Sequence, residues 1–407
     1  ELRMTCLGAT EYVSTASRGG KSHVTSRQTT HSGPDIYDRL GVQKVINAQS
    51  WVTALGGSLM RPEVFRAMEE AGQHFIMMDQ LYEAGGKVVA RACGAEAGMV
   101  CAGAAAGNLL MAASVMTGTD DARIERLPDT TGMKNEVLIF KAQRNHYDKA
   151  FEQAGASLVD VGMPGGATDY QLEAAINDNT AAVSYIFAPF IKQPVPLKRV
   201  VEIAHARGVP VIVDASAQVP PIENLTMPIK MGADMVTYSG GKGIGGPQNS
   251  GLLAGRKDLI AAAHKNYMNP GSPRASIARP AKVSKESIVG LVTAIELFLE
   301  TDHAAVWESW RAQAKHIAGK LQGIPGLRVT LEEHEDRQGP QPVVYFGPGW
   351  KGPSPSEVRE RLRSGKTPII VGGGGYGDEI NMSMVNVQPG EEKIIADRLL
   401  EILKPTK

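Results

Sequence analysis

Residues 235–248 read MVTYSGGKGIGGPQ, a short apolar run followed by a glycine-rich turn that carries one lysine, Lys242. The apolar run predicts a buried strand, and the flanking glycines let backbone and ligand approach closely. A lysine presented in this way is typical of one that forms a Schiff base with an aldehyde cofactor. Ser239, three residues earlier, could donate a hydrogen bond to a cofactor phosphate. Glycine-rich loops with one lysine also occur on protein surfaces without any covalent role.

Upstream, residues 205–213 read HARGVPVIV, which predicts a helix end, a turn and a buried strand that ends at Asp214. Ligands of open α/β sheets bind at the carboxyl ends of strands. A carboxylate there is suited to pairing with a protonated pyridine nitrogen, which makes the ring an electron sink. The 28 positions from Asp214 to Lys242 allow a crossover between parallel strands. An aspartate after a strand is otherwise often a helix cap or a turn former.

Small residues fill positions 103–107, GAAAG, between a strand predicted around Met99 and a helix that includes Leu109. Backbone amides at a helix N-terminus bind phosphate without charged side chains, so Gly103, Ala104 and Ala105 are candidate phosphate ligands. The alternative is close helix packing. Residues 241–246 also match Gly-x-Gly-x-x-Gly, but no acidic residue follows about twenty positions on, so a dinucleotide site is not favoured.

Taken together, these stretches resemble the selenocysteine synthase-like branch of the fold-type-I pyridoxal phosphate enzymes, and within it the D-glucosaminate-6-phosphate ammonia-lyase-like proteins. The resemblance covers roughly residues 35 to 400. It rests on Val211–Pro221, Gly232–Asp234, Ser239–Lys242, Gly246–Gln248, Val45–Ala48, Cys101–Asn108 and Leu127–Val137.

The resemblance implies pyridoxal 5'-phosphate as cofactor, with Lys242, Asp214 and His146 as catalytic residues. It also implies that His146 stacks on the cofactor ring, although a histidine here could instead lie at the surface or cap a helix. Gln218 could reach the phenolic oxygen of the cofactor or satisfy a loop backbone. The full set of expected cofactor ligands is Gly103, Ala104, Ala105, His146, Asp214, Ser216, Gln218, Ser239 and Lys242.

Cations that could bind a substrate carboxylate or phosphate gather at residues 273–282, PRASIARPAK. Arginine forks suit both anions, so Arg274, Arg279, Lys282 and Arg61 are the candidate substrate ligands. Many fold-type-I enzymes use an arginine of the C-terminal domain for the carboxylate. Residues 368–375 offer glycines instead, which argues against a conventional amino-acid transaminase.

The expected reaction is α,β-elimination from a hydroxylated amino acid or amino-sugar acid, giving a 2-keto acid and ammonia. In this hypothesis Lys242 removes the Cα proton and the ring paired with Asp214 spreads the charge. Retro-aldol cleavage and racemisation stay open, because the sequence does not show the alignment at Cα. A non-catalytic protein that binds the cofactor or a sugar acid is the alternative of another class.

Composition narrows the partners. The 43 basic and 43 acidic side chains balance, so nucleic-acid binding has no electrostatic support. Three cysteines fit a reducing, cytoplasmic compartment, and no Cys-x-x-Cys or His-Glu-x-x-His motif predicts a metal site. No apolar run approaches the roughly 18 residues of a membrane span. We expect a small-molecule substrate, no membrane partner, and a homodimer or larger homo-oligomer, as is usual for this fold.

Alternating strand and helix patterns predict an α/β fold with a mostly parallel sheet, helices on both faces, and a smaller α+β C-terminal domain. The expected divisions are an N-terminal arm at 1–34, a large cofactor domain at 35–265 and a small domain at 266–407. The arm is rich in Ser and Thr and lacks acidic residues from Ser14 to Pro34. It suits a transit peptide, a solvated arm, a cloning remnant or a segment docked on a partner subunit.

Overall fold

The structure, a computed structural model, describes residues 34–188, 190–333, 339–375 and 377–404. The predicted N-terminal arm therefore lies outside the described residues, apart from Pro34. The chain divides into two compact units, residues up to Lys44 and residues from Val45 onward. In the first unit, α1 (Ile36–Leu40) begins at a capping box between Asp35 and Asp38 and ends at Gly41 in the left-handed region.

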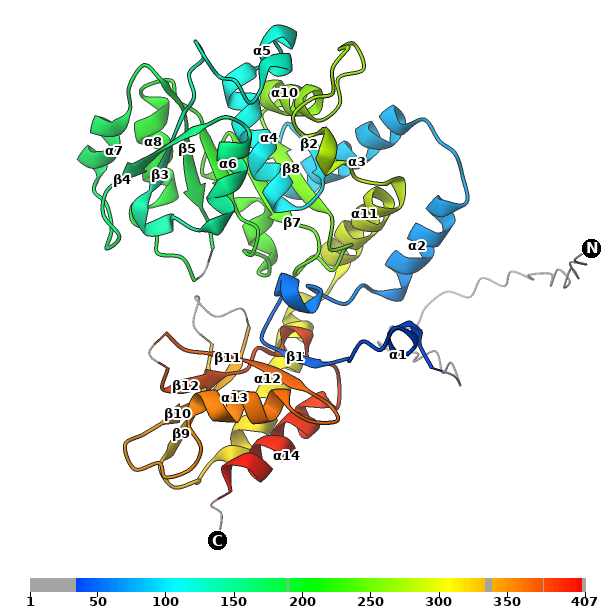
Figure 1. The fold of residues 1–407 in the computed structure, drawn as a ribbon, viewed down its shortest axis with the longest axis vertical. Helices are drawn as coiled ribbons and strands as arrows, with labels where there is room; N and C mark the ends of the chain where they lie inside the picture. The colour runs from blue at the N-terminus through cyan, green and yellow to red at the C-terminus, as the bar shows by residue number, and fades with distance from the viewer. Residues whose placement is uncertain (1–33, 189, 334–338, 376, 405–407) are drawn as a thin grey trace, which may run out of the picture. The chain divides into compact units, whose positions relative to one another are not determined.

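A seven-stranded sheet forms the larger part of the second unit (Figure 1). Its strand order is β2-β8-β7-β6-β5-β3-β4, and only β8 runs antiparallel to the other strands. The prediction of a mostly parallel sheet is confirmed. The strands are β2 (Ala97–Cys101), β3 (Glu136–Phe140), β4 (Ser157–Val161), β5 (Thr180–Ile186), β6 (Val211–Asp214), β7 (Met235–Ser239) and β8 (Gly251–Gly255).

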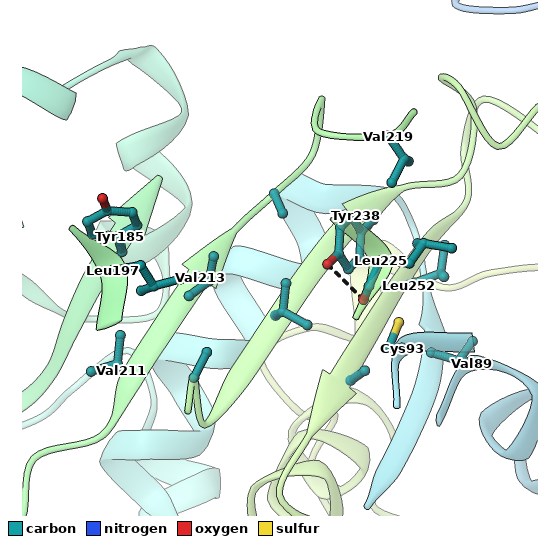
Figure 2. Close-up of a cluster of buried hydrophobic side chains, with 14 of the residues drawn as sticks. Val89, Cys93, Tyr185, Leu197, Val211, Val213, Val219, Leu225, Tyr238 and Leu252 are labelled. Atoms are coloured by element: carbon teal, nitrogen blue, oxygen red, sulfur yellow. Dashed lines mark hydrogen bonds between the residues drawn. The ribbon is translucent and has the colours of Figure 1, made fainter. Parts of the chain in front are cut away.

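Helices cover both faces of this sheet, because successive side chains of a buried strand point to opposite sides. In β6, Val211 and Val213 enter one core cluster and Ile212 enters the other. Figure 2 shows part of the first cluster, where the Tyr238 hydroxyl donates to the backbone oxygen of Leu225 at 3.0 Å. The first cluster includes side chains of α3 (Met78–Cys93), α8 (Leu197–His205) and α11 (Lys285–Glu300), and the second includes side chains of α4 (Ala104–Thr117), α10 (Lys257–Tyr267) and Phe151 of α6 (Lys149–Gln153).

A five-stranded sheet has the order β1-β11-β12-β10-β9. It is mixed, since β1 pairs in parallel with β11 and the other pairs are antiparallel. Three helices share a core with it: α12 (His303–Leu321), α13 (Pro355–Arg363) and α14 (Glu391–Leu403). The strands are β1 (Ile46–Ala48), β9 (Leu327–Glu332), β10 (Gln341–Phe346), β11 (Ile369–Gly373) and β12 (Glu379–Asn381).

The division of the chain between the two sheets differs from the predicted domain boundaries. β1 falls within the predicted large domain, yet Ala48 lies opposite Val371 of β11 in the smaller sheet. Conversely, α11 falls within the predicted small domain, but its Ile288 and Leu291 belong to the core cluster of the larger sheet. Both departures arise because apolar surface is buried against whichever element is near in space, not near in sequence.

Among the described residues, no helix is both long enough and apolar enough to cross a lipid bilayer.

Candidate active site

Two cavities adjoin at Lys242 and Trp51, which line both of them. The first cavity, about 210 Å³, lies at the carboxyl ends of the parallel strands, where β6 ends at Asp214 and β7 ends at Ser239. The second cavity, about 350 Å³, is lined by the turn after Lys242, the start of α2 (Pro62–Gly72) and the region where α11 passes into α12. Strand ends of this kind are where open α/β sheets bind ligands.

Lys242 lies in a turn that glycine alone permits. A Cβ on Gly241 would stand 2.4 Å from Cα of Gln248, and one on Gly243 would stand 2.1 Å from the backbone oxygen of Val219. Neighbouring loops therefore hold both sides of the lysine, which leaves its side chain half-buried between the cavities. Burial lowers the pKa of Lys242, while the charge of Asp214 acts in the opposite direction. A lowered pKa increases the fraction of nucleophilic free amine.

Asp214 is buried and its carboxylate is held by two donors. Nδ2 of Asn108 donates to Oδ2 at 2.7 Å, and the backbone N–H of Ser216 donates to Oδ1 at 2.9 Å. A carboxylate oxygen accepts more than one hydrogen bond, so the side of Asp214 that lines the first cavity can accept another donor. This geometry suits an N–H group of a ligand ring.

The N-terminus of α4 closes another side of the first cavity through Gly103, Ala104 and Ala105. The first N–H groups of a helix lack intrahelical partners, and Gly103 makes the preceding turn with a φ of 84°. Gly107 lets this helix approach the sheet, because a Cβ there would lie 2.0 Å from Oγ1 of Thr237. Ser216 and Ser239 also line the cavity. A group of donors of this kind can bind an anion without a charged side chain.

Tyr147 and Trp51 contribute aromatic rings to the wall of the first cavity, whereas His146 does not line it; His146 and Tyr147 are both exposed. A stacking role of His146 stays a prediction, and Tyr147 is an alternative ring for that role. Consecutive side chains of a tight helical turn point in different directions, and this one, His146–Asp148, is fixed at its start. Asn145 accepts from the N–H of Tyr147 at 2.8 Å, and Nε of Arg144 donates to Asp148 at 2.6 Å.

Gln218 also departs from its expected position. It does not line the first cavity, and its Oε1 is buried without a hydrogen-bond partner among the described residues. Gln248 lines the cavity instead, with Nε2 donating to the backbone oxygen of Thr53 at 3.2 Å.

Of the four predicted substrate cations, only Arg61 lines either cavity. Arg274, Arg279 and Lys282 are exposed and line neither. Their segment is tied to α5 (Asp121–Arg126), since Ser272 donates to Glu125 at 2.5 Å. That helix follows the C-terminus of α4, whose 14 residues span roughly 20 Å from the first cavity. Ser272, two residues before Arg274, is therefore held near the end of α4 that is farther from the first cavity.

Asn108, Gln248 and Trp51 are among the cavity residues that sequence reasoning missed. Asn108 and Gln248 stand inside stretches that carry the resemblance, so their position was a usable signal. Trp51 follows β1, and nothing local indicates that this loop reaches the lysine turn. Asn386 holds the loop there, because its Nδ2 donates to the backbone oxygens of Ser50 and Gly57 at 3.1 and 2.9 Å.

Comparison with known proteins agrees with this geometry. The family model described as SelA, L-seryl-tRNA selenium transferase, matches residues 45–307. The chain belongs to this family. Its match spans the first cavity and the lysine turn.

Two curated relatives match nearly the whole chain. D-glucosaminate-6-phosphate ammonia lyase of Salmonella typhimurium is 34% identical, over 91% of this chain and 98% of the relative. The 5'-C-glycyluridine monooxygenase-decarboxylase of a Streptomyces species is 32% identical, over 94% of this chain and 95% of the relative.

Solved structures confirm the fold class. A structure of D-glucosaminate-6-phosphate ammonia-lyase superposes with a TM-score of 0.78 at 33% identity, covering 91% of this chain and 98% of the other. A cysteine desulfurase from Thermococcus onnurineus, at 18% identity, shares the fold with a TM-score of 0.58 over 91% of this chain and 96% of the other. The fold is that of the fold-type-I pyridoxal phosphate enzymes, as the resemblance implied.

Proposed function

We propose that this chain is a pyridoxal phosphate-dependent ammonia lyase that converts a hydroxylated amino acid or amino-sugar acid into a 2-keto acid and ammonia. One observation carries the proposal: a lysine whose pKa is lowered by burial faces a cavity that also holds a buried carboxylate and a free helix N-terminus. The extended similarity to an enzyme named as an ammonia lyase supports the reaction type.

The residues of the first cavity fit pyridoxal phosphate. Its three reactive regions, an aldehyde, a pyridine nitrogen and a phosphate, correspond to an amine at Lys242, an acceptor at Asp214 and N–H donors at the start of α4. Asn108 adds a further sign of fit, because its Oδ1 is buried without a partner among the described residues. A buried acceptor left unpaired is costly, and a ligand hydroxyl or a water in this cavity would satisfy it.

When bound, the cofactor supplies an aldehyde that condenses with amines and a ring that withdraws electrons from the α-carbon. Lys242 serves two purposes in this proposal. Its amine holds the cofactor between turnovers, and once displaced, Nζ takes the proton from the α-carbon of the substrate. Its lowered pKa suits both purposes, since a protonated amine is neither nucleophile nor base.

Asp214 would accept the ring N–H of the bound cofactor and keep the ring protonated. Asn108 and the N–H of Ser216 fix the orientation of the carboxylate. The N–H groups of Ala104 and Ala105, with the hydroxyls of Ser216 and Ser239, would hold the phosphate. Tyr147 would pack against the ring. The overall conversion balances: a β-hydroxy amino acid loses water, regains it by hydrolysis, and yields a 2-keto acid and ammonium.

The experiment combines labelling with product analysis. The protein is incubated with pyridoxal phosphate, reduced with borohydride and digested, and the peptides are analysed by mass spectrometry. We expect the cofactor to be attached to Lys242. Ammonia and keto acid are then measured with D- and L-hydroxy amino acids and amino-sugar acids, including D-glucosaminate 6-phosphate. Labelling elsewhere, or no ammonia from any member, would contradict the proposal.

A second reaction class is favoured by the similarity to a monooxygenase-decarboxylase, which is almost as extensive as that to the ammonia lyase. Measuring oxygen uptake and carbon dioxide in the same incubations separates the two, because elimination consumes no oxygen and releases no carbon dioxide. Aldehyde would indicate aldol cleavage, and an inverted substrate would indicate racemisation. Cofactor binding without any of these products would support a non-catalytic regulator.

The proposal includes a homo-oligomer in the cytoplasm. Large apolar side chains are exposed along α2 and the segment before α3, at Phe65, Phe75, Ile76 and Met77. Apolar surface of this kind marks protein interfaces. Cys93 and Cys101 are buried free thiols whose pKa burial raises to about 12, which supports a reducing compartment. Light scattering of the purified protein tests the assembly.

A further inference from the structure

The wall of the second cavity combines polar side chains with an apolar part formed by Leu297, Phe298, Val306, Trp310 and Val385. Its volume of about 350 Å³ lies within the range of small-molecule sites. Because Lys242 and Trp51 line both cavities, a substrate whose amine reaches Lys242 from this side would place the rest of its body here.

Several polar side chains of this cavity already donate to backbone oxygens of the chain. Ser58 donates to Gly241 at 3.1 Å and Thr301 donates to Leu297 at 2.7 Å. Nδ2 of Asn386 donates to the backbone oxygens of Ser50 and Gly57, and Nε2 of Gln388 donates to the backbone oxygen of Asn386 at 2.9 Å. Nε2 of His303 lies 2.8 Å from the backbone oxygen of Phe298. A ligand rich in hydroxyls would therefore find few free donors among these side chains, and would bond to them chiefly by donating to their remaining acceptor oxygens.

The charge of the cavity is also small. Among the described residues, the lysine and arginine side chains that line this cavity are Lys242 and Arg61. Nε of Arg61 is 3.6 Å from Glu63, which offsets part of its charge. The two terminal guanidinium nitrogens of Arg61 can donate to both oxygens of one carboxylate as a fork. A ligand that carries a phosphate group, with a charge of about −1.5 to −2, in addition to a carboxylate would not have its charge neutralised in this cavity.

We propose that the second cavity is the substrate compartment and that it selects an amino acid with an apolar, aliphatic or aromatic body and one anionic group at Arg61, in preference to a phosphorylated polyhydroxy chain. This inference rests on the proposed function, because it assumes an amine substrate that reacts at Lys242. It narrows the substrate class to β-hydroxy amino acids with an apolar β-substituent.

Unreactive probes test the compartment separately from the chemistry. 3-Phenylpropanoate carries an apolar body and one carboxylate, whereas gluconate 6-phosphate carries hydroxyls and a phosphate, and neither has an amine. Binding to the cofactor-loaded protein is followed by calorimetry and by the fluorescence of Trp51 and Trp310, which line the cavity. We expect 3-phenylpropanoate to bind at least about tenfold more tightly than gluconate 6-phosphate, which corresponds to about 1.4 kcal/mol. The opposite order, or equal affinity, would overturn the proposal.

Matched variants locate the site. Arg61→Gln should weaken binding of 3-phenylpropanoate about tenfold, as expected for loss of a charge-assisted fork. Arg66→Gln is the control, since Arg66 is exposed on the same helix and does not line the cavity. Leu297→Ala should also weaken binding, and Leu299→Ala, at a side chain 38% exposed outside the cavity, should leave it unchanged. Equal effects within either pair would overturn the assignment.

The reactive arm compares ammonia release from 3-phenylserine and from D-glucosaminate 6-phosphate. The proposal expects the larger kcat/KM for 3-phenylserine. Preference for the phosphorylated sugar acid would overturn this inference while supporting the ammonia lyase. Tight, Arg61-dependent binding of 3-phenylpropanoate with no ammonia from any substrate would support the compartment and contradict the proposed function.

Discussion

The two cavities that adjoin at Lys242 use polar residues in opposite ways. In the first cavity, the hydroxyls of Ser216 and Ser239 and the first N–H groups of α4 have no hydrogen-bond partner among the described residues and remain available to a ligand. In the second, Ser58, Thr301 and Asn386 already donate to backbone oxygens of the chain. A count of polar residues would make the cavities look alike. The difference shows that the polarity of a site is set by donors that lack a partner, not by residue type.

The largest expected effect comes from removing the residue that both cavities share. Lys242→Ala should lower kcat by about a thousandfold or more, because it removes the amine that serves as nucleophile and base. The measurement is ammonia release under saturating cofactor. Binding of 3-phenylpropanoate should persist, since the apolar wall of the second cavity is untouched. Retained turnover would show that the cavities do not share a catalytic amine.

Asp214 lines only the first cavity, so replacing it should affect the first cavity and not the second. Asp214→Asn should lower kcat by about a hundredfold or more, because a neutral amide no longer stabilises a charged ring nitrogen. Asp234→Asn is the matched control: Asp234 is also buried, but it bonds to His205 and Arg256 and lines neither cavity. That variant should lower the thermal unfolding temperature and spare kcat. Similar kinetics for both variants would contradict a role of Asp214 in the reaction.

The pH dependence of cofactor attachment tests the electrostatics of Lys242. Burial lowers its pKa and thus favours the neutral amine, so attachment should rise with pH and reach its plateau below the range of an exposed lysine. The charge of Asp214 favours the protonated amine, and Asp214→Asn should therefore move the rise to still lower pH. Borohydride trapping across a pH series measures both curves. A rise at higher pH in the variant would reverse the assigned influence of the two residues.

A smaller effect should distinguish the adjacent side chains of His146 and Tyr147. Tyr147→Ala should weaken pyridoxal phosphate about three- to tenfold, in line with the roughly 0.5–1.5 kcal/mol of an aromatic pair. His146→Ala should change the affinity little, because His146 is exposed and does not line the cavity. Titration of the apo-protein with cofactor gives both values. The reverse ranking would restore the histidine of the sequence-based prediction.

Much of the fold could be predicted from local patterns. The strands Glu136–Phe140 and Ser157–Val161 and the helix Glu391–Leu403 fit the predicted alternation of strand and helix patterns, because such periodicities can be recognised in a short window of sequence. The same local reasoning predicted that Asp214 and Lys242 stand near neighbouring strand ends. Asp214 lies opposite Thr237 in the pairing of β6 with β7. A short crossover between parallel strands leaves little freedom for any other arrangement.

Local patterns failed where a residue depends on a distant segment. The pairing of β1 with β11 joins residues more than three hundred positions apart, and it sends the loop with Trp51 toward Lys242. Arg274, Arg279 and Lys282 form a basic cluster in sequence, but the anchoring of their segment to α5 takes them away from both cavities. The choice between His146 and Tyr147 depends on the rotation of a single turn. The local hydrophobic pattern would be the same whichever of these arrangements the chain adopted, so it could not predict them.

By itself, the sequence indicated the cofactor, because the glycine-flanked lysine, the aspartate at a strand end and the small-residue helix start all stand in stretches that resemble the fold-type-I pyridoxal phosphate enzymes. Tertiary structure alone decided which side chains face that site and which polar groups remain free within it. The physical reason is the sequence separation over which each kind of interaction acts. Backbone preferences and strand periodicity act over a few residues, whereas a cavity is formed by side chains brought together through burial and long-range hydrogen bonds, such as that of Asn108 with Asp214.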